Sequence, residues 1–229
     1  MENTNAAEKS CHTMLGAART RRHRKIFGNR LLTTVSCIFS THMHSLIIFA
    51  SGTGTNAAAI IAHFKTTGKA KVALIVCNKA EAGVLDIARR EEIPFLIIDK
   101  QTFHETLLPE QMADYKPSLI VLAGFLWKIP EAIIHAFPGK IINIHPALLP
   151  GYGGKGMYGS KVHDAVISAG DKESGITIHY VNEHYDEGNI IVQARCRIHE
   201  NDTADALAAN IHKLEHFYFP RAIEFLLEQ

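Results

Sequence analysis

The sequence predicts one α/β domain, in which helices cover both faces of a mostly parallel sheet, and three features support this prediction. Short, unbroken apolar runs recur at intervals of roughly 20–25 residues, as expected for strands that are buried on both faces. Segments with a helical spacing of apolar residues lie between these runs. Alternating strands and helices of this kind favour parallel strands with crossover helices. We expect this domain to occupy residues 45–229.

Each predicted strand is a short apolar run that ends at polar residues or glycine, which marks the start of a loop. After Pro150 a glycine-rich stretch interrupts the alternation, and two further strands follow. The predicted strands are 46–50, 72–76, 95–98, 119–122, 141–144, 176–181 and 190–198.

The predicted helices include two with clear start signals. Pro130 opens one of them, a position where its missing N–H is tolerated, and Thr203 precedes a long amphipathic helix at the end of the chain as a capping residue. The predicted helices are 57–65, 83–92, 103–115, 130–136, 161–169 and 203–227.

Composition excludes several classes of protein. The 229 residues are 47% hydrophobic and 21% charged, so a wholly disordered chain is excluded. No run of 18 apolar residues occurs, so we expect no membrane-spanning helix and no membrane partner. The four cysteines form no CxxC pair, which is typical of a protein in a reducing cytoplasm rather than of a disulfide scaffold.

Charge is distributed unevenly along the chain. Residues 1–45 hold 7 of the 24 Lys and Arg and 2 of the 23 Asp and Glu, a net charge of +5. The other residues therefore hold 17 basic and 21 acidic groups, a net charge of −4. A mildly acidic domain argues against nucleic acid as a partner.

Residues 1–44 show no sustained periodicity and contain the basic cluster RRHRK. We expect a disordered or non-native extension, with an organellar targeting segment as the alternative. Met43 stands immediately before the first predicted strand, where the domain could begin.

A glycine-containing loop, SGTGTN, follows the first predicted strand and precedes a helix. Ligands of open α/β sheets bind at the carboxyl ends of the strands, and a helix N-terminus attracts phosphate. The loop is therefore either a phosphate site or a simple tight turn. With Ala57 it also matches the GxGxxA pattern of dinucleotide-binding proteins, but Asn78 and Lys79 stand where that pattern requires an acid.

Asn143 and His145 lie two positions apart at the end of the fifth predicted strand, so both side chains face the same side. An amide and an imidazole directed at one point could stabilise an oxyanion and move a proton. The alternative is a buried histidine satisfied by backbone groups. Asp186 follows in a turn between two strands, with His179 upstream, and would otherwise be a capping residue of that turn.

The final helix contains HKLEH, which matches the HxxEH pattern of some zinc peptidases. This interpretation requires a third ligand downstream, and Glu224 and Glu228 are the available candidates. NDT at 201–203 is a formal glycosylation sequon, but a helix start explains it more simply.

Five motifs occur in a characteristic order along the chain: SGTGTN, AGFLWKIP, NIHPALLPGYGGKGMYG, TIHYVNEHYDEG with GNIIVQ, and HKLEHFYFP. In this order they closely resemble the phosphoribosylglycinamide formyltransferase family, folate-dependent enzymes of purine synthesis. The resemblance covers residues 46–227. It is weaker to methionyl-tRNA formyltransferase, which has a different first loop and an additional RNA-binding domain, and to formyltetrahydrofolate hydrolase, which has a regulatory domain upstream.

The resemblance implies a formyltransferase fold with a Rossmann-like sheet, and two small-molecule substrates. These are 10-formyltetrahydrofolate, as co-substrate, and glycinamide ribonucleotide; no metal is implied. The residues implied for the ribonucleotide are Gly54, Thr55 and Asn56 at its phosphate, and His212, Lys213, Leu214 and Glu215 along the final helix. Those implied for the folate are Arg89, Leu126, Trp127, Lys128, Ile129, Asn143, Asn182, Glu183, His184, Tyr185 and Asp186. Trp127 and Lys128 are unusual residues for that segment of the family.

By the same resemblance, the catalytic residues are Asn143, His145 and Asp186. The amine would attack the formyl carbon, Asn143 and a protonated His145 would stabilise the oxyanion, and Asp186 would raise the pKa of His145. Two alternatives remain: a nucleotide-binding oxidoreductase, favoured by GxGxxA, and a phosphosugar-binding protein, which would leave these three residues unexplained.

Overall fold

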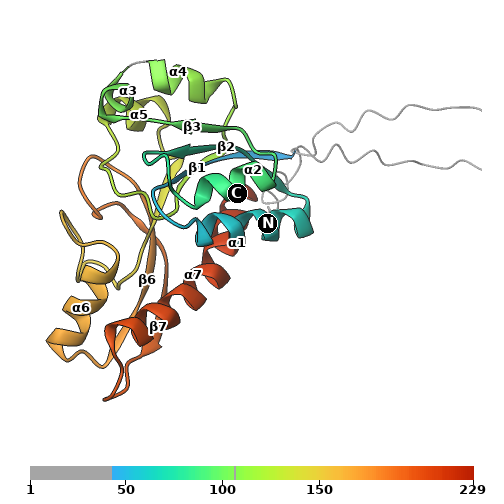
Figure 1. Ribbon diagram of the computed structural model, residues 1–229. Coiled ribbons are helices and arrows are strands. Elements are labelled where there is room, and N and C mark those ends of the chain that lie inside the picture. The colour runs from blue at the N-terminus through green and yellow to red at the C-terminus, as the bar shows by residue number, and fades with distance from the viewer. Residues whose placement is uncertain (1–42, 106) are drawn as a thin grey trace, which may run out of the picture. The chain divides into compact units, whose positions relative to one another are not determined.

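A computed structural model describes residues 43–229, except residue 106. Its centre is a seven-stranded sheet with the strand order β3-β2-β1-β4-β5-β6-β7 (Figure 1). The five strands from β3 to β5 run parallel, whereas β6 runs antiparallel to both β5 and β7. The strands are β1 (His44–Ala50), β2 (Ala70–Cys77), β3 (Phe95–Ile97), β4 (Leu119–Leu122), β5 (Ile141–His145), β6 (Glu173–Tyr180) and β7 (Ile190–Arg197).

Helices cover both faces of the sheet, and each face has its own hydrophobic core. One face carries α1 (Thr55–Thr67), α2 (Val84–Arg90), α6 (Ser160–Ala169) and α7 (Ala204–Leu227). The other carries α3 (Lys100–His104), α4 (Leu107–Ala113) and α5 (Glu131–Ala136). This arrangement confirms the predicted α/β class and the mostly parallel sheet.

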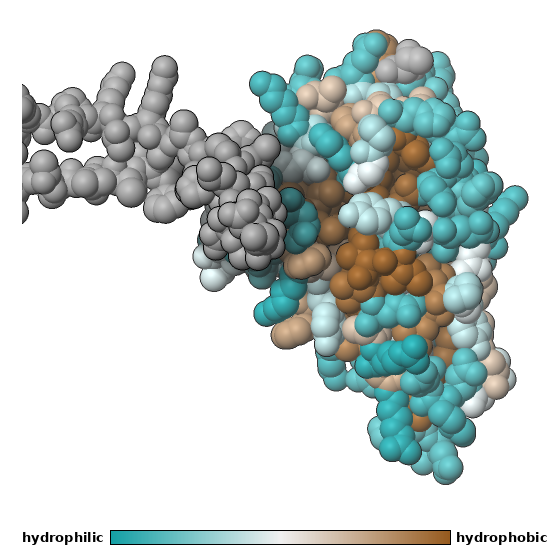
Figure 2. Space-filling model, turned by 180° about the vertical axis from the view of Figure 1, so that it is seen from behind, coloured by the Kyte–Doolittle hydropathy of each residue, from teal (hydrophilic) through white to brown (hydrophobic). Residues whose placement is uncertain are grey.

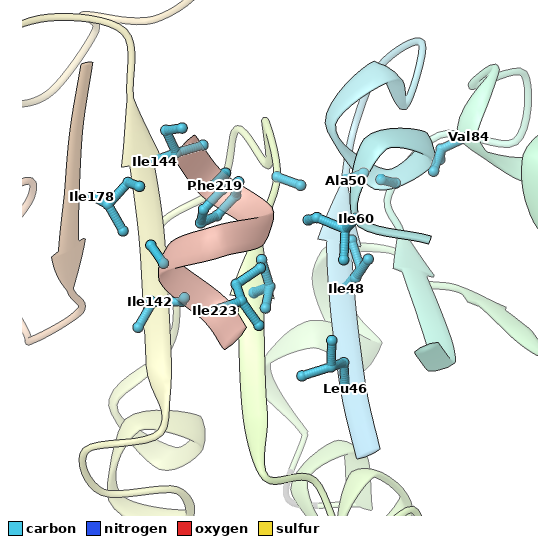
Figure 3. Packing of buried hydrophobic residues seen from close by; sticks show 14 of the residues in the cluster. Leu46, Ile48, Ala50, Ile60, Val84, Ile142, Ile144, Ile178, Phe219 and Ile223 are labelled. Atoms are coloured by element: carbon cyan, nitrogen blue, oxygen red, sulfur yellow. The ribbon is translucent and has the colours of Figure 1, made fainter. Parts of the chain in front are cut away.

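The central strands are buried because both of their faces pack against helices. Ile48 of β1 faces the first core, whereas Ile47 and Phe49 face the second, so alternate side chains of one apolar run serve opposite layers. Figure 3 shows Phe219 and Ile223 of α7 packed near Ile142 and Ile144 of β5. The long final helix α7 therefore packs both on α1 and on the strands β5, β6 and β7 of the second half of the sheet.

One predicted helix was wrong in extent. The segment predicted as 103–115 forms two short helices, because Pro109 lies in the first turn of α4. A proline ring clashes with the carbonyl group four residues earlier, here that of Glu105, so α3 cannot continue through this point. Glu105 instead adopts an extended conformation that ends α3.

Among residues 43–105 and 107–229, no helix is long and apolar enough to cross a membrane. Some large apolar side chains of this region are nevertheless exposed, such as Phe217 and Phe225 on α7. Figure 2 shows apolar side chains gathered in the middle of one face and hydrophilic ones around them. The expectation for residues 1–44 falls almost entirely outside the described residues.

Candidate active site

A cavity of about 640 Å³ opens at the carboxyl ends of β1, β4 and β5. Its walls come from the loops that follow these strands, from the glycine-rich segment 154–159, from the loop between β6 and β7, and from α6 and α7. Open α/β sheets bind their ligands at this edge. The three polar clusters identified in the sequence all line this cavity.

The loop between β1 and α1 ends at Gly54, which caps α1 with a φ of 80°. A side chain here would also lie 2.8 Å from Val84, so glycine is required on two grounds. Ser51 is buried, and its Oγ accepts a 3.1 Å hydrogen bond from the backbone N–H of Leu126. This bond joins the predicted phosphate loop to the segment predicted to contact folate.

Asn56 lies at the start of α1 and directs its side chain to Glu215 of α7. Its Nδ2 donates a 3.0 Å hydrogen bond to Glu215 Oε2, and both residues are buried. His212 Nδ1 donates to the same oxygen at 2.9 Å, and this hydrogen bond raises the pKa of His212. The side chain of Asn56 therefore positions a carboxylate, and its backbone lies at the start of the helix, where a phosphate could bind.

Asn143 of β5 is held by His179 of β6, the residue that pairs with it across the sheet. His179 Nδ1–H donates to the Tyr180 carbonyl at 2.8 Å, so its Nε2 can accept from Asn143 Nδ2 at 3.2 Å. Asn143 Nδ2 also lies 3.5 Å from Asp186 Oδ1. A hydrogen bond of 3.5 Å is weak, so a developing oxyanion could displace Asp186 and accept this N–H of Asn143 instead.

His145 is 3% exposed and lies between a carbonyl and a carboxylate. Its Nε2–H donates to the Tyr152 carbonyl at 2.8 Å, and its Nδ1 lies 3.6 Å from Asp186 Oδ2. Burial lowers the pKa of His145 and outweighs the charge of Asp186, which would raise it. The expectation of a raised pKa was therefore wrong, and the resting imidazole is neutral near pH 7.

Asp186 remains ionised although it is largely buried. Burial would raise its pKa, but its closeness to the His179 and His145 rings and the hydrogen bond from the Gly154 N–H together lower it. The Gly154 N–H donates to Oδ2 at 2.9 Å. Two residues later, Gly188 packs against the Tyr180 carbonyl so closely that any side chain would overlap it. This contact closes the base of the loop that carries Asp186.

The structure brings most of the expected residues to this cavity, but four lie elsewhere. Arg89 pairs with Asp86 at 2.7 Å and stacks over Phe95, outside this cavity. The others are Lys213, which binds Asn210, Leu214, which packs on the core, and Glu183, which pairs with His135.

A second cavity of about 570 Å³ adjoins the first and shares with it the segment from Leu126 to Ile129 and Tyr185. Two lysines and a histidine line it, Lys100, Lys128 and His104, together with one carboxylate, Glu131. Aromatic rings form its wall, with Phe103 and Trp127 at 5.5 Å between centroids. Lys128 also lies over the Tyr185 ring, 5.8 Å from its centroid.

Sequence reasoning missed the roles of three residues. Ser51 and His179 lie within two of the motifs, SGTGTN and TIHYVNEHYDEG, but neither residue was given a role there, although strand pairing with Asn143 could have indicated that of His179. His163, on α6, lines the cavity and is 5% exposed. No motif signalled this residue, because its place in the cavity wall depends on tertiary packing, including that of α6 on α7.

The HxxEH histidines do not converge on a common point. The His212 and His216 rings are stacked, with planes 20° apart and centroids 6.2 Å apart, and His212 Nδ1 is already bound to Glu215. No group of three or more His, Cys, Asp or Glu side chains in the described part of the chain has an arrangement that could hold a metal ion.

Comparison with known proteins identifies a consistent set of relatives. The sequence model of a family described as formyl transferase matches residues 44–223. Phosphoribosylglycinamide formyltransferase of Bacillus subtilis is 38% identical over 191 residues, which cover 81% of this chain and 95% of that protein. The chloroplastic enzyme of the same name from Arabidopsis thaliana is 39% identical over 191 residues, covering 80% of this chain. This chain spans 65% of the length of the Arabidopsis protein.

Solved structures show the same likeness. Glycinamide ribonucleotide transformylase 1 from Symbiobacterium toebii superimposes with a TM-score of 0.77 at 32% identity. The superposition covers 83% of this chain and 91% of that one. The phosphoribosylglycinamide formyltransferase structure from Bacillus halodurans gives a TM-score of 0.73 at 34% identity, covering 81% of this chain and 96% of that one.

Proposed function

The chain belongs to the formyl transferase family, and from this premise we propose that it transfers a formyl group from 10-formyltetrahydrofolate to glycinamide ribonucleotide in purine biosynthesis. The acceptor is the primary amine of N1-(5-phospho-D-ribosyl)glycinamide. One amine proton is exchanged for the formyl group, and the folate nitrogen that loses the formyl group takes up a proton, so the products are the formylated amine and tetrahydrofolate.

One observation carries this proposal: a single cavity joins the N-terminus of α1, a buried carboxylate and an Asn-His-Asp cluster. The backbone of Gly54, Thr55 and Asn56 suits the phosphate, because the 13-residue helix α1 begins there. Glu215 suits the amine, and its Oε1 remains for a ligand because both protein donors bind Oε2. Both features line the same cavity, and the 3.0 Å hydrogen bond from Asn56 to Glu215 joins them, so one ligand with a phosphate and an amine could contact both.

The folate would lie along the segment from Leu126 to Ile129, which separates the two cavities. Apolar and aromatic groups there, such as Trp127, suit a flat heteroaromatic ring, and the cations of the second cavity suit its acidic tail. Lys100 and Lys128 are better placed for this tail than Arg89, which lines neither cavity. Bound there, the folate supplies an activated formyl carbon.

Three side chains would then act on the reacting atoms. Asn143 would donate to the formyl oxygen as negative charge develops on it. His145, neutral at rest, would gain a proton as this charge grows, since Asp186 stabilises the imidazolium form from 3.6 Å away. Holding the two substrates in the correct geometry would contribute on the order of 7–11 kcal/mol. We further propose a cytoplasmic location, with neither nucleic acid nor membrane as a partner.

The test is a spectrophotometric assay of tetrahydrofolate release with purified protein, 10-formyltetrahydrofolate and glycinamide ribonucleotide. We expect turnover that requires both substrates and is lost when ribose 5-phosphate replaces the acceptor. A His145→Asn variant purified in parallel is the matched control, because a contaminating host enzyme would survive in that preparation. Absence of turnover in the unmodified protein, or equal rates in both preparations, would contradict the proposal. Binding of NAD would instead favour an oxidoreductase.

A further inference from the structure

His163 is a buried histidine in the cavity wall with an unsatisfied ring nitrogen. It lies on α6, its side chain is 5% exposed, and it lines the same cavity as Glu215 and His145. Its Nδ1 is fully buried and has no hydrogen-bond partner among residues 43–105 and 107–229. Unpartnered buried polar groups are costly, so their retention calls for a functional reason.

The groups that face His163 come from three elements. Glu215 and His212 lie on α7, His145 lies at the end of β5, and Asp164 follows His163 on α6 itself. Burial lowers the pKa of His163 more than Glu215 and Asp164 raise it. The ring is therefore neutral near pH 7, and one of its nitrogens carries a lone pair that can accept a hydrogen bond.

The neighbouring carboxylate, that of Glu215, already has His212 as a partner of opposite charge. His212 donates to Glu215 at 2.9 Å, and the pKa of His212 is raised by this bond, so the pair carries little net charge when His212 is protonated. Asn56 donates to the same oxygen. A lone carboxylate would bind an ammonium group more strongly than an uncharged amine. The Glu215–His212 pair carries little net negative charge, so it attracts an ammonium group less, and the site favours the uncharged amine.

We propose that His163 and Glu215 together hold the acceptor's primary amine in its uncharged form, with one N–H donated to Glu215 Oε1 and the other to a ring nitrogen of His163. This inference rests on the proposed function. An ammonium group has no lone pair and cannot attack a formyl carbon. When two acceptors take the two N–H groups, the lone pair is left free for the attack.

Substitutions at His163 separate this role from a structural one. His163→Phe keeps the ring shape but removes the acceptor, and we expect kcat/KM for glycinamide ribonucleotide to fall about tenfold or more. His163→Asn places its amide oxygen near the position of Nδ1, the unpartnered ring nitrogen, and we expect it to recover part of this loss. The Kd of ribose 5-phosphate, which has the phosphate but no amine, should change less than about twofold in both variants. His199→Phe, the same change at an exposed histidine outside the cavity, is the control.

The outcomes distinguish this inference from the function on which it rests. If the unmodified protein does not formylate glycinamide ribonucleotide, the proposed function fails before any variant is considered. If the unmodified protein is active and His163→Phe keeps its kcat/KM, the inference is wrong. It is also wrong if ribose 5-phosphate binding weakens as much as kcat/KM falls, because His163 would then only support the fold of the site. A kcat/KM loss confined to the amine-bearing substrate, with partial recovery in His163→Asn, supports it.

Discussion

Asn56 and Glu215 are 159 positions apart in the sequence, yet a buried 3.0 Å hydrogen bond joins their side chains. Asn56 belongs to the first turn of α1, and Glu215 lies in the middle of α7. The bond therefore fixes the proposed phosphate end of the cavity relative to the proposed amine end. A substrate that spans both ends depends on this separation being constant.

Asn56→Ala should weaken both the fold and acceptor binding. The substitution removes a donor from a buried carboxylate, which costs about 1–3 kcal/mol of unfolding free energy. We expect KM for glycinamide ribonucleotide to rise as well, because Glu215 loses one of the groups that hold it in place. Urea unfolding and steady-state kinetics measure the two effects. The control is Asn210→Ala, a half-buried residue of α7 that hydrogen-bonds Lys213 near the surface, and its effect should stay within about 0.5 kcal/mol. Equal stabilities of the two variants would contradict the prediction.

Asp186→Asn should depress kcat by about 10²–10⁴-fold, the usual contribution of general acid–base catalysis. Asparagine tolerates the left-handed backbone of this position, where φ is 56°, so the loop should keep its conformation. The ribose 5-phosphate affinity should change little, because the phosphate is proposed to bind at α1. A loss confined to substrate affinity would show that Asp186 only shapes the loop.

The double variant His145→Asn, Asp186→Asn should be scarcely slower than the slower single variant. The two side chains lie 3.6 Å apart and are proposed to act as one unit, and the effects of such residues are not additive. Comparing kcat for the four proteins of this cycle tests the coupling. Multiplicative losses would mean that the residues act independently.

The free energy of unfolding should decrease as the pH falls below about 6.5, the pKa of histidine in an unfolded chain. Burial lowers the pKa of both His145 and His163, so in this range the unfolded state binds more protons than the folded state. The raised pKa of His212 acts in the opposite direction, but its side chain is 55% exposed and solvent weakens the effect. Urea unfolding between pH 7 and pH 5 gives the slope. The His163→Gln variant should show a smaller slope, whereas the control His199→Gln should keep the slope of the unmodified protein. A free energy of unfolding that rises on acidification would contradict the lowered pKa of the two buried histidines.

Purified, untagged protein should contain far less than one zinc ion per chain. The stacked His212 and His216 rings do not present their nitrogens to a common point, and a tetrahedral site requires such convergence. Elemental analysis, together with turnover before and after treatment with a chelator, provides the measurement. Stoichiometric zinc with activity lost on chelation would restore the HxxEH interpretation.

A variant that begins at Met43 should keep its melting temperature and turnover. All candidate site residues follow this position, and β1 begins at His44. Thermal unfolding and the formyl-transfer assay, run beside the full chain, test the prediction. A loss of several degrees or a tenfold fall in turnover would show that residues 1–42 contribute to the domain.

The sequence predicted the sheet and the loops at its carboxyl edge, because buried apolar runs and glycine turns are local signals. It could not predict how side chains from distant elements combine. The neutral state of His145 is one example: the resemblance implied that Asp186 raises its pKa, but burial, which depends on packing, lowers it. His179 is another, since its contact with Asn143 exists only through the pairing of β5 with β6. Likewise, the position of Arg89 follows from the orientation of α2, which the motif pattern does not specify.

The placement of Glu215 on α7 has a consequence for biosynthesis. Chains emerge from the ribosome amino end first, so β1, the phosphate loop and the Asn-x-His strand are made before α7. A nascent chain that stops short of α7 holds neither the carboxylate proposed for the amine nor the helix that covers β5. Under the proposed function, an unfinished chain could present part of the folate wall but could not take up the acceptor. Formyl transfer would thus be confined to molecules whose synthesis has passed the last helix.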